Sequence, residues 1–155
     1  MGRKTVILRS QKGFALLEIF LDLAIVAVCL GVMAAYQYLA VKKSNIKIVE
    51  RELAMLNAGA VSFAEHRSPK AYPPTTKTIC VDFFLRERPQ IVRRVLEDPL
   101  SKTKEEYHYA RSPNGLYYCF WSVGDNSVSD TEGIDDNGNI IKNKASDDIY
   151  LTSLY

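Results

Sequence analysis

Residues 14–41 read FALLEIFLDLAIVAVCLGVMAAYQYLAV, and this stretch decides the fold class. Only Glu18 and Asp22 within it are ionised at neutral pH. About 28 residues in a helix rise roughly 42 Å, which is enough to cross the hydrocarbon core of a bilayer. We therefore expect a transmembrane helix near the N-terminus, followed by a sequence of ordinary soluble composition.

The residues before this stretch favour a retained anchor over a cleaved secretory signal. Residues 1–13, MGRKTVILRSQKG, contain four basic residues and no acidic one, as the start of a secretory signal would. However, no small-residue cleavage pattern follows before Lys42, and the apolar stretch is too long for a signal. The basic leader favours a cytoplasmic N-terminus, although Lys42, Lys43 and Lys47 weaken that bias. We expect a single-pass protein of the cytoplasmic membrane with its C-terminal head outside the cytoplasm.

The helix is expected to continue beyond the membrane, from residue 42 to residue 66. Apolar residues recur there at steps of three and four, which places them in one stripe on a polar helix. The stripe consists of Ile46, Val49, Leu53, Leu56, Ala60 and Phe63. Because the first proline is Pro69, one continuous helix of about 50 residues is predicted. Its second half would pack against a globular head.

The head is expected to begin with irregular chain and a helix. A connection rich in proline and hydroxyl residues spans 66–78. A helix is predicted around 83–96, with Asp82 as its N-cap and Pro89 as an interruption.

The remainder of the head predicts a small antiparallel sheet. Segments of strand-like composition lie at 107–110, 116–123 and 149–151. The sequence SPNG, residues 112–115, has the residues of a tight turn between the first two. The predicted fold is therefore α+β, with a long N-terminal helix packed on a small β-sheet.

The composition indicates neither an enzyme nor a nucleic-acid-binding protein. The formal net charge is +2, and the basic residues are scattered along the chain. His66 and His108 are the two histidines, and neither belongs to a catalytic motif. The sequence also contains no phosphate-binding loop or dinucleotide fingerprint.

Three cysteines leave the redox state open. Cys29 lies in the apolar stretch, where a buried or lipid-facing thiol is expected. Cys80 and Cys119 lie in the head and could form a disulfide in an oxidising compartment. Since neither has the spacing of a metal or redox motif, a bridge and two free thiols both agree with the sequence.

Residues 12–18, KGFALLE, resemble the class III signal of type IV pilins and pseudopilins. In that family a prepilin peptidase cuts after the glycine, the new first residue is N-methylated, and the fifth mature residue is a glutamate. The resemblance implies cleavage after Gly13, methylation of Phe14 and an assembly role for Glu18. The carboxylate of Glu18 would neutralise the Phe14 amine of a neighbouring subunit and so set the stagger of helices in a filament. Asp22 departs from the family's apolar pattern, and an inert position near the membrane surface is the alternative for it.

Motifs in the head are similar to those of the major pseudopilins of type II secretion systems. They are YPPTT at 72–76, Asp98-Pro99 ahead of a strand, WSVGDN at 121–126 and DDI at 147–149. In that family the loop between the last two motifs binds one calcium ion. The resemblance implies a calcium site with the ligand residues Asp125, Asn126, Asp147, Asp148 and Val123.

The chemistry of the acidic stretch 125–148 is also compatible with calcium. It carries seven carboxylates in a glycine-containing loop, and calcium prefers such oxygen ligands. The stretch is not an EF-hand, because Ile140 stands where that motif, counted from Asp135, requires glycine. A solvated acidic loop without an ion is the alternative.

The expected function is that of a structural filament subunit, closest to the major pseudopilin of a type II secretion-like system, which moves folded proteins outward. Expected partners are further copies of the chain, prepilin peptidase, the inner-membrane assembly platform, minor pilins and membrane lipid. Two alternatives stay open: a surface type IV pilin for adhesion or motility, and an uncleaved membrane-anchored protein that binds calcium or a partner. The expected domains are a leader (1–13), the membrane and assembly half of the helix (14–41), its amphipathic half (42–66) and the head (67–155).

Overall fold

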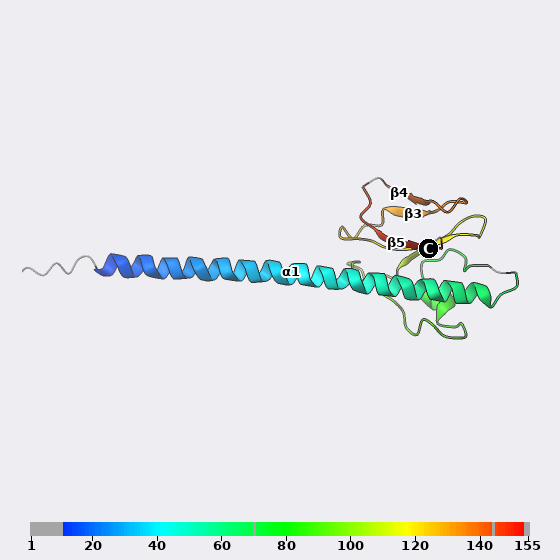
Figure 1. Ribbon diagram of the computed structural model, residues 1–155, viewed down its shortest axis with the longest axis horizontal. Coiled ribbons are helices and arrows are strands. Elements are labelled where there is room, and N and C mark those ends of the chain that lie inside the picture. Colours follow the sequence, from blue (N-terminus) through cyan, green and yellow to red (C-terminus); the bar gives the residue numbers. More distant parts are fainter. Residues whose placement is uncertain (1–10, 70, 144, 154–155) are drawn as a thin grey trace, which may run out of the picture. The chain divides into compact units, whose positions relative to one another are not determined.

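The computed structural model describes residues 11–69, 71–143 and 145–153, and for residues 11–15 it describes the backbone alone. The described chain forms a long helix α1 (Gln11–Glu65), a short π-helical turn η1 (Cys80–Phe84) and five strands (Figure 1). The strands are β1 (His108–Arg111), β2 (Tyr118–Ser122), β3 (Thr131–Ile134), β4 (Ile140–Lys142) and β5 (Ile149–Thr152). The chain divides into two compact units between Lys43 and Ser44.

The first unit, as far as it is described, is the apolar part of α1. Every side chain from Leu16 to Val41 is exposed, and the large apolar ones expose between 53% and 76% of their surface. A helix that is apolar on all sides is stable in lipid or against other apolar surfaces. The helix is long and apolar enough to cross a membrane, as the sequence predicts.

In the second unit, the C-terminal part of α1 packs against an antiparallel sheet with the strand order β1–β2–β5. Figure 1 shows the hairpin β3–β4 beyond this sheet, so that the sheet lies between α1 and the hairpin. Side chains of β2 alternate between the two faces: Tyr118 and Phe120 contact the α1 side, whereas Cys119 and Trp121 contact the hairpin side. Because both faces are covered, all five residues of β2 are buried.

The predicted apolar stripe of α1 supplies one wall of this core. Its buried members are Val49, Leu53, Leu56, Ala60 and Phe63. The predicted strands appear as β1, β2 and β5, and the predicted turn joins the first two. In that turn the N–H of Gly115 donates to the carbonyl of Ser112 at 2.9 Å, with Gly115 at a φ of +75°. The α+β layout of helix and antiparallel sheet is therefore confirmed.

The helix predicted around 83–96 is wrong. Only η1 is helical there, and the chain then runs irregularly to β1. Pro89 has no N–H to donate and disfavours helical geometry in the residue before it, which explains the interruption. Phe84, Val92 and Leu96 are nevertheless buried, because an irregular chain carries them into the core.

Asp82 lies inside η1 and is not the N-cap that the sequence predicts. Its carboxylate accepts hydrogen bonds from the hydroxyl groups of Thr76 and Thr78. These bonds lower the pKa of Asp82, because they favour its charged form. The carboxylate thus fixes the connection that leads from α1 to η1.

The hairpin β3–β4 is absent from the sequence-based expectation, which treats 125–148 as one loop. Asn137-Gly138 forms its turn, with Gly138 at a φ of +85°. Oδ1 of Asp135 accepts the N–H groups of Asn137 at 2.9 Å and of Asn139 at 2.7 Å. An Asn-Gly pair between short apolar segments is a hairpin signal, so the sequence did contain a sign of this element.

Candidate functional site

The expected processing site lies at the start of α1. Gly13 and Phe14 belong to the helix by their backbone, whereas the side chain of Phe14 and all of residues 1–10 lie outside the described part of the chain. Glu18 and Asp22 are exposed and stand about one helical turn apart. Among the described side chains, none forms an ion pair with either carboxylate. Both carboxylates are therefore accessible to a group of another molecule.

Three aspartates meet in the second unit where two strands begin. Asp130 directly precedes β3, and Asp147 and Asp148 lie just before β5. One carboxylate oxygen from each residue lies within 4.8 Å of the others. Such a group of oxygens suits a shared metal ion, so the three residues could hold one.

Asp148 is the most buried of the three, with 8% of its surface exposed. Its Oδ2 accepts the N–H groups of Asp130 at 3.0 Å and of Thr131 at 2.7 Å. Its Oδ1 is buried and has no hydrogen-bond partner among the described residues, and the same holds for Oγ1 of Thr131. Since buried polar atoms normally have a partner, the free Oδ1 of Asp148, a member of the cluster, fits a site that a cation completes.

A tight turn at residues 123–126 wraps around Asp147. Oδ2 of Asp147 accepts the N–H groups of Asp125 at 2.9 Å and of Asn126 at 3.2 Å. Gly124 has a φ of +66°, and a Cβ there would stand only 2.6 Å from the backbone oxygen of Asp147. The turn therefore requires glycine at this position.

The structure places the predicted calcium ligands in two groups. Asp147 and Asp148 belong to the cluster of three aspartates, whereas Asp125 and Asn126 contact Asp147 through their backbone N–H groups. The side chain of Asn126 donates from Nδ2 to Oδ2 of Asp130 at 3.1 Å. Asp130 is the member of the cluster that the sequence-based ligand set lacks.

Val123, the remaining predicted ligand residue, is held by Asp98. The carboxylate of Asp98 is 1% exposed, and its Oδ2 accepts the N–H of Val123 at 2.9 Å. Its Oδ1 accepts the hydroxyl of Ser122 at 2.8 Å and the N–H of Leu100 at 2.9 Å. Three donors thus stabilise the buried carboxylate of Asp98. By holding Ser122 and Val123, Asp98 positions the turn that surrounds Asp147.

The disulfide considered between Cys80 and Cys119 is not formed, because both residues are free thiols. They belong to the two apolar clusters on opposite faces of the sheet, Cys80 on the α1 side and Cys119 on the hairpin side. Burial raises the pKa of each thiol to about 12, so both are neutral at physiological pH. Cys29, the third cysteine, is exposed on α1.

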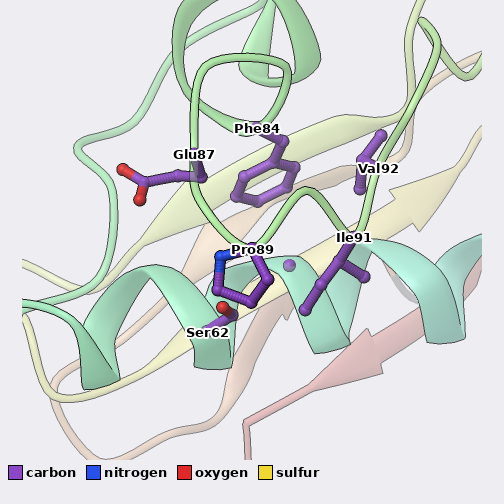
Figure 2. A pocket seen from close by; sticks show the side chains of 7 residues that line it. Ser62, Phe84, Glu87, Pro89, Ile91 and Val92 are labelled. Atoms are coloured by element: carbon purple, nitrogen blue, oxygen red, sulfur yellow. The ribbon is translucent and has the colours of Figure 1, made fainter.

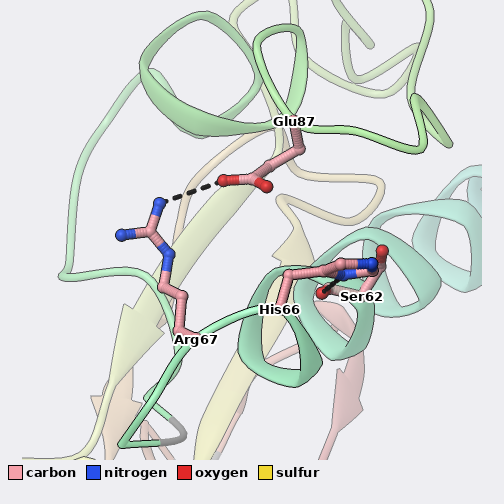
Figure 3. Close-up of polar contacts among 4 residues, drawn as sticks. All are labelled: Ser62, His66, Arg67 and Glu87. Atoms are coloured by element: carbon pink, nitrogen blue, oxygen red, sulfur yellow. Dashed lines mark hydrogen bonds and ion pairs between the residues drawn. The ribbon is translucent and has the colours of Figure 1, made fainter.

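The end of α1 borders a hollow that is too small for a ligand. Ser62 and Phe84 are among its lining residues (Figure 2), and the hollow is too narrow to admit a water molecule. Nearby, Arg67 donates to Glu87 at 3.0 Å, and Nδ1 of His66 donates to the backbone oxygen of Ser62 at 2.7 Å (Figure 3). These contacts stabilise the C-terminal end of α1.

The described residues thus offer a cluster of three aspartates suited to a metal ion and an apolar helix suited to a membrane. No protein-family model, curated protein or solved structure matches the chain.

Proposed function

We propose that the chain is a structural subunit of a type IV pilus-like filament and is cut after Gly13 by a prepilin peptidase. One observation carries this proposal, namely the order of features at the N-terminus. A basic leader is followed by Gly13, Phe14, a glutamate at the fifth position after the cut and a long apolar helix. Each feature is common alone, but a processed and self-assembling membrane helix needs all of them in this order.

The exposed apolar surface of α1 supports both anchoring and assembly. Large apolar side chains between Leu16 and Val41 surround the helix on all sides. They can contact lipid while the subunit is stored in the membrane, and neighbouring helices once it joins a filament. A helix that served only to pack against its own head would need one apolar stripe.

Glu18 is proposed to set the stagger between neighbouring subunits. A carboxylate inside hydrocarbon costs a few kcal/mol, and so does an unpaired amine. Cleavage after Gly13 would create such an amine on Phe14. When the amine of one copy meets Glu18 of the next, each charge offsets the cost of the other, and this happens at a single axial offset of the two helices.

The proposed system is a type II secretion-like pseudopilus in which this chain is the major subunit. The head motifs at 72–76 and 121–126 favour this subtype, by resemblance, over a surface pilus for adhesion or motility. The N-terminus would lie in the cytoplasm and the head outside it, where the assembly platform and minor pilins draw subunits from the membrane.

We also propose that calcium binds between Asp130, Asp147 and Asp148. Calcium prefers oxygen ligands such as carboxylates, and the buried, partnerless Oδ1 of Asp148 supports a cation at this place. The ion would supply positive charge that offsets the three carboxylates. Asp130 and Asp148 would thereby hold the beginnings of β3 and β5 together.

Mass spectrometry of the N-terminus tests the proposed processing. The full chain is produced together with a prepilin peptidase and extracted from membranes. A mature chain that starts at Phe14 and carries one added methyl group is expected. Replacing Gly13 with a bulky residue, as in Gly13→Leu, should leave the chain uncleaved, because the peptidase needs a backbone without a side chain there.

Gly31→Leu provides the matched control for this experiment. Gly31 lies in the same helix, and a Cβ at this position meets no atom within 4 Å. The control should be cleaved like the original chain. An intact leader on the original chain would refute the filament proposal and favour the uncleaved membrane-anchored protein.

A further inference from the structure

A polar groove of about 340 Å³ lies in the second unit beside α1. Ile48 and Glu52 of α1 form one wall, and residues between Arg94 and Lys104 form the other. This volume falls within the range of sites that bind small molecules or headgroups. The groove is thus the larger of the two hollows described, and the one with room for a ligand.

Two of the acidic residues in the groove already have hydrogen-bond partners within the protein. Oε1 of Glu52 accepts from Arg94 at 2.7 Å, and Oε2 accepts from the Tyr107 hydroxyl at 3.0 Å. Asp98 is buried and holds the three donors described above. Neither carboxylate is therefore available to a ligand from solution.

The exposed charges of the groove are mainly positive. Lys102 and Lys104 are exposed, and neither has an ion-pair partner among the described side chains. Arg94 is 68% exposed although it contacts Glu52. Because the charge of Arg94 is paired with Glu52, Glu97 is the exposed carboxylate of the lining that opposes the two lysines. The groove therefore suits an anion.

A hydrogen-bonded turn holds the two lysines in place. The N–H of Asp98 donates to Glu105, that of Ser101 donates to Asp98, and that of Lys104 donates to Ser101. Lys104 itself has a φ of +52°, as the turn requires. Because Asp98 also binds the end of β2, the backbone that carries Lys102 and Lys104 is held in place. Little backbone entropy is therefore lost when an anion binds.

The covalent chain keeps this groove close to the membrane. Ile48 follows Val41, the last residue of the apolar stretch, by seven positions. Seven residues span about 10 Å as a helix and at most about 25 Å when fully extended. At any angle between the two units, Ile48 therefore stays within the reach of lipid headgroups. Because the chain itself links the groove to the membrane segment, the effective concentration of headgroups at the groove is high.

We propose that the groove binds the phosphate headgroup of an anionic phospholipid, such as phosphatidylglycerol, while the chain is in the membrane. Lys102, Lys104 and Arg94 would contact the phosphate. This inference depends on the membrane anchoring within the proposed function, and it depends on neither cleavage nor filament assembly. On this proposal the head rests on the membrane surface while the groove holds the lipid.

Native mass spectrometry of the full chain in neutral detergent, with EDTA present, tests the proposal. Phosphatidylglycerol is titrated, and its binding is compared with that of phosphatidylcholine and of inorganic phosphate. Removing one lysine near a membrane surface weakens such binding about fivefold, so Lys102→Gln with Lys104→Gln should weaken phosphatidylglycerol binding about 25-fold. Lys77→Gln with Arg88→Gln removes the same charge from exposed positions outside the groove and should change little.

Equal binding by both double variants, or equal binding of phosphatidylcholine, would overturn the lipid site. Binding of inorganic phosphate as tight as that of the lipid would replace it with a free-anion site. If the groove variant loses dimers from its spectrum but keeps the lipid, the groove is a contact between copies of the chain and not a lipid site. A chain that stays in solution without detergent would instead refute the anchor itself, so the two failures are distinguishable.

Discussion

Asp98→Asn should destabilise the head strongly, although the two side chains have nearly the same shape. The carboxylate is buried and accepts three hydrogen bonds, from Leu100, Ser122 and Val123. In the variant the amide oxygen can keep the first two bonds. The amide nitrogen replaces Oδ2 and faces the N–H of Val123, so donors oppose each other in a buried place.

The size of this effect follows from the three contacts. A buried donor without an acceptor costs about 1–3 kcal/mol, and the loss of charge from the two remaining bonds adds roughly 1 kcal/mol. A total of about 3 kcal/mol corresponds to a melting temperature lower by about 12 °C for a domain of this size. Since small domains are stable by about 5–15 kcal/mol, this loss is a large share of the total.

Fluorescence of Trp121 provides the assay. It is the single tryptophan of the chain and is 5% exposed. It lies next to Ser122, which Asp98 binds, so its emission reports on the head in the detergent-solubilised full chain. Glu105→Gln, an exposed change on the same turn, is the matched control and should leave the melting temperature within about 2 °C. An Asp98→Asn chain that melts like this control would refute the reasoning.

Two further predictions concern assembly and the metal. The Glu18→Ala variant should be cleaved like the original chain but should fail to form filaments, since the Phe14 amine loses its counter-charge. Electron microscopy of filaments sheared from cells tests this prediction. Normal filaments from the variant would contradict the role of Glu18. Calcium at about 100 times its dissociation constant should raise the free energy of unfolding by roughly 2.7 kcal/mol, as seen by Trp121 fluorescence. The Asp148→Asn variant should lose this gain in stability, whereas Asp136→Asn, a change in the β3–β4 turn, should keep it. If the original chain has the same melting temperature with calcium and with EDTA, the proposed calcium site is refuted.

Local patterns in the sequence predict α1 and three of the five strands. The stripe from Val49 to Phe63 is read from spacing alone, because a helix repeats within its own residues. The aromatic residues of β2, such as Tyr118 and Phe120, predict a strand in the same way. These elements have strong signals since each buries an apolar face.

The hairpin has a weaker signal in the sequence, and the full set of aspartates could not be predicted from local patterns. The Asn137-Gly138 pair signals the turn between β3 and β4, but both strands are short and lie within an acidic stretch, so the charges obscure the strand pattern. Asp130 joins Asp148 only because β3 places it there, which is a contact across 18 residues of chain. Asp98 is similar, since its partners Ser122 and Val123 are brought to it by the fold. Contacts between distant segments leave no periodic trace in the sequence.

The all-round apolar surface of α1 has a consequence for the direction of the proposed assembly. Hydrocarbon and neighbouring helices shelter leucine and valine about equally well. Moving α1 from bilayer to filament would therefore be an exchange of one apolar environment for another, with a small net driving force from the side chains between Leu16 and Val41. Glu18 would then bias the exchange, because its carboxylate is costly in lipid and would be paired with the Phe14 amine of a neighbouring copy in the proposed filament. On this proposal the apolar residues make the transfer reversible, and the carboxylate of Glu18 gives it a preferred end point.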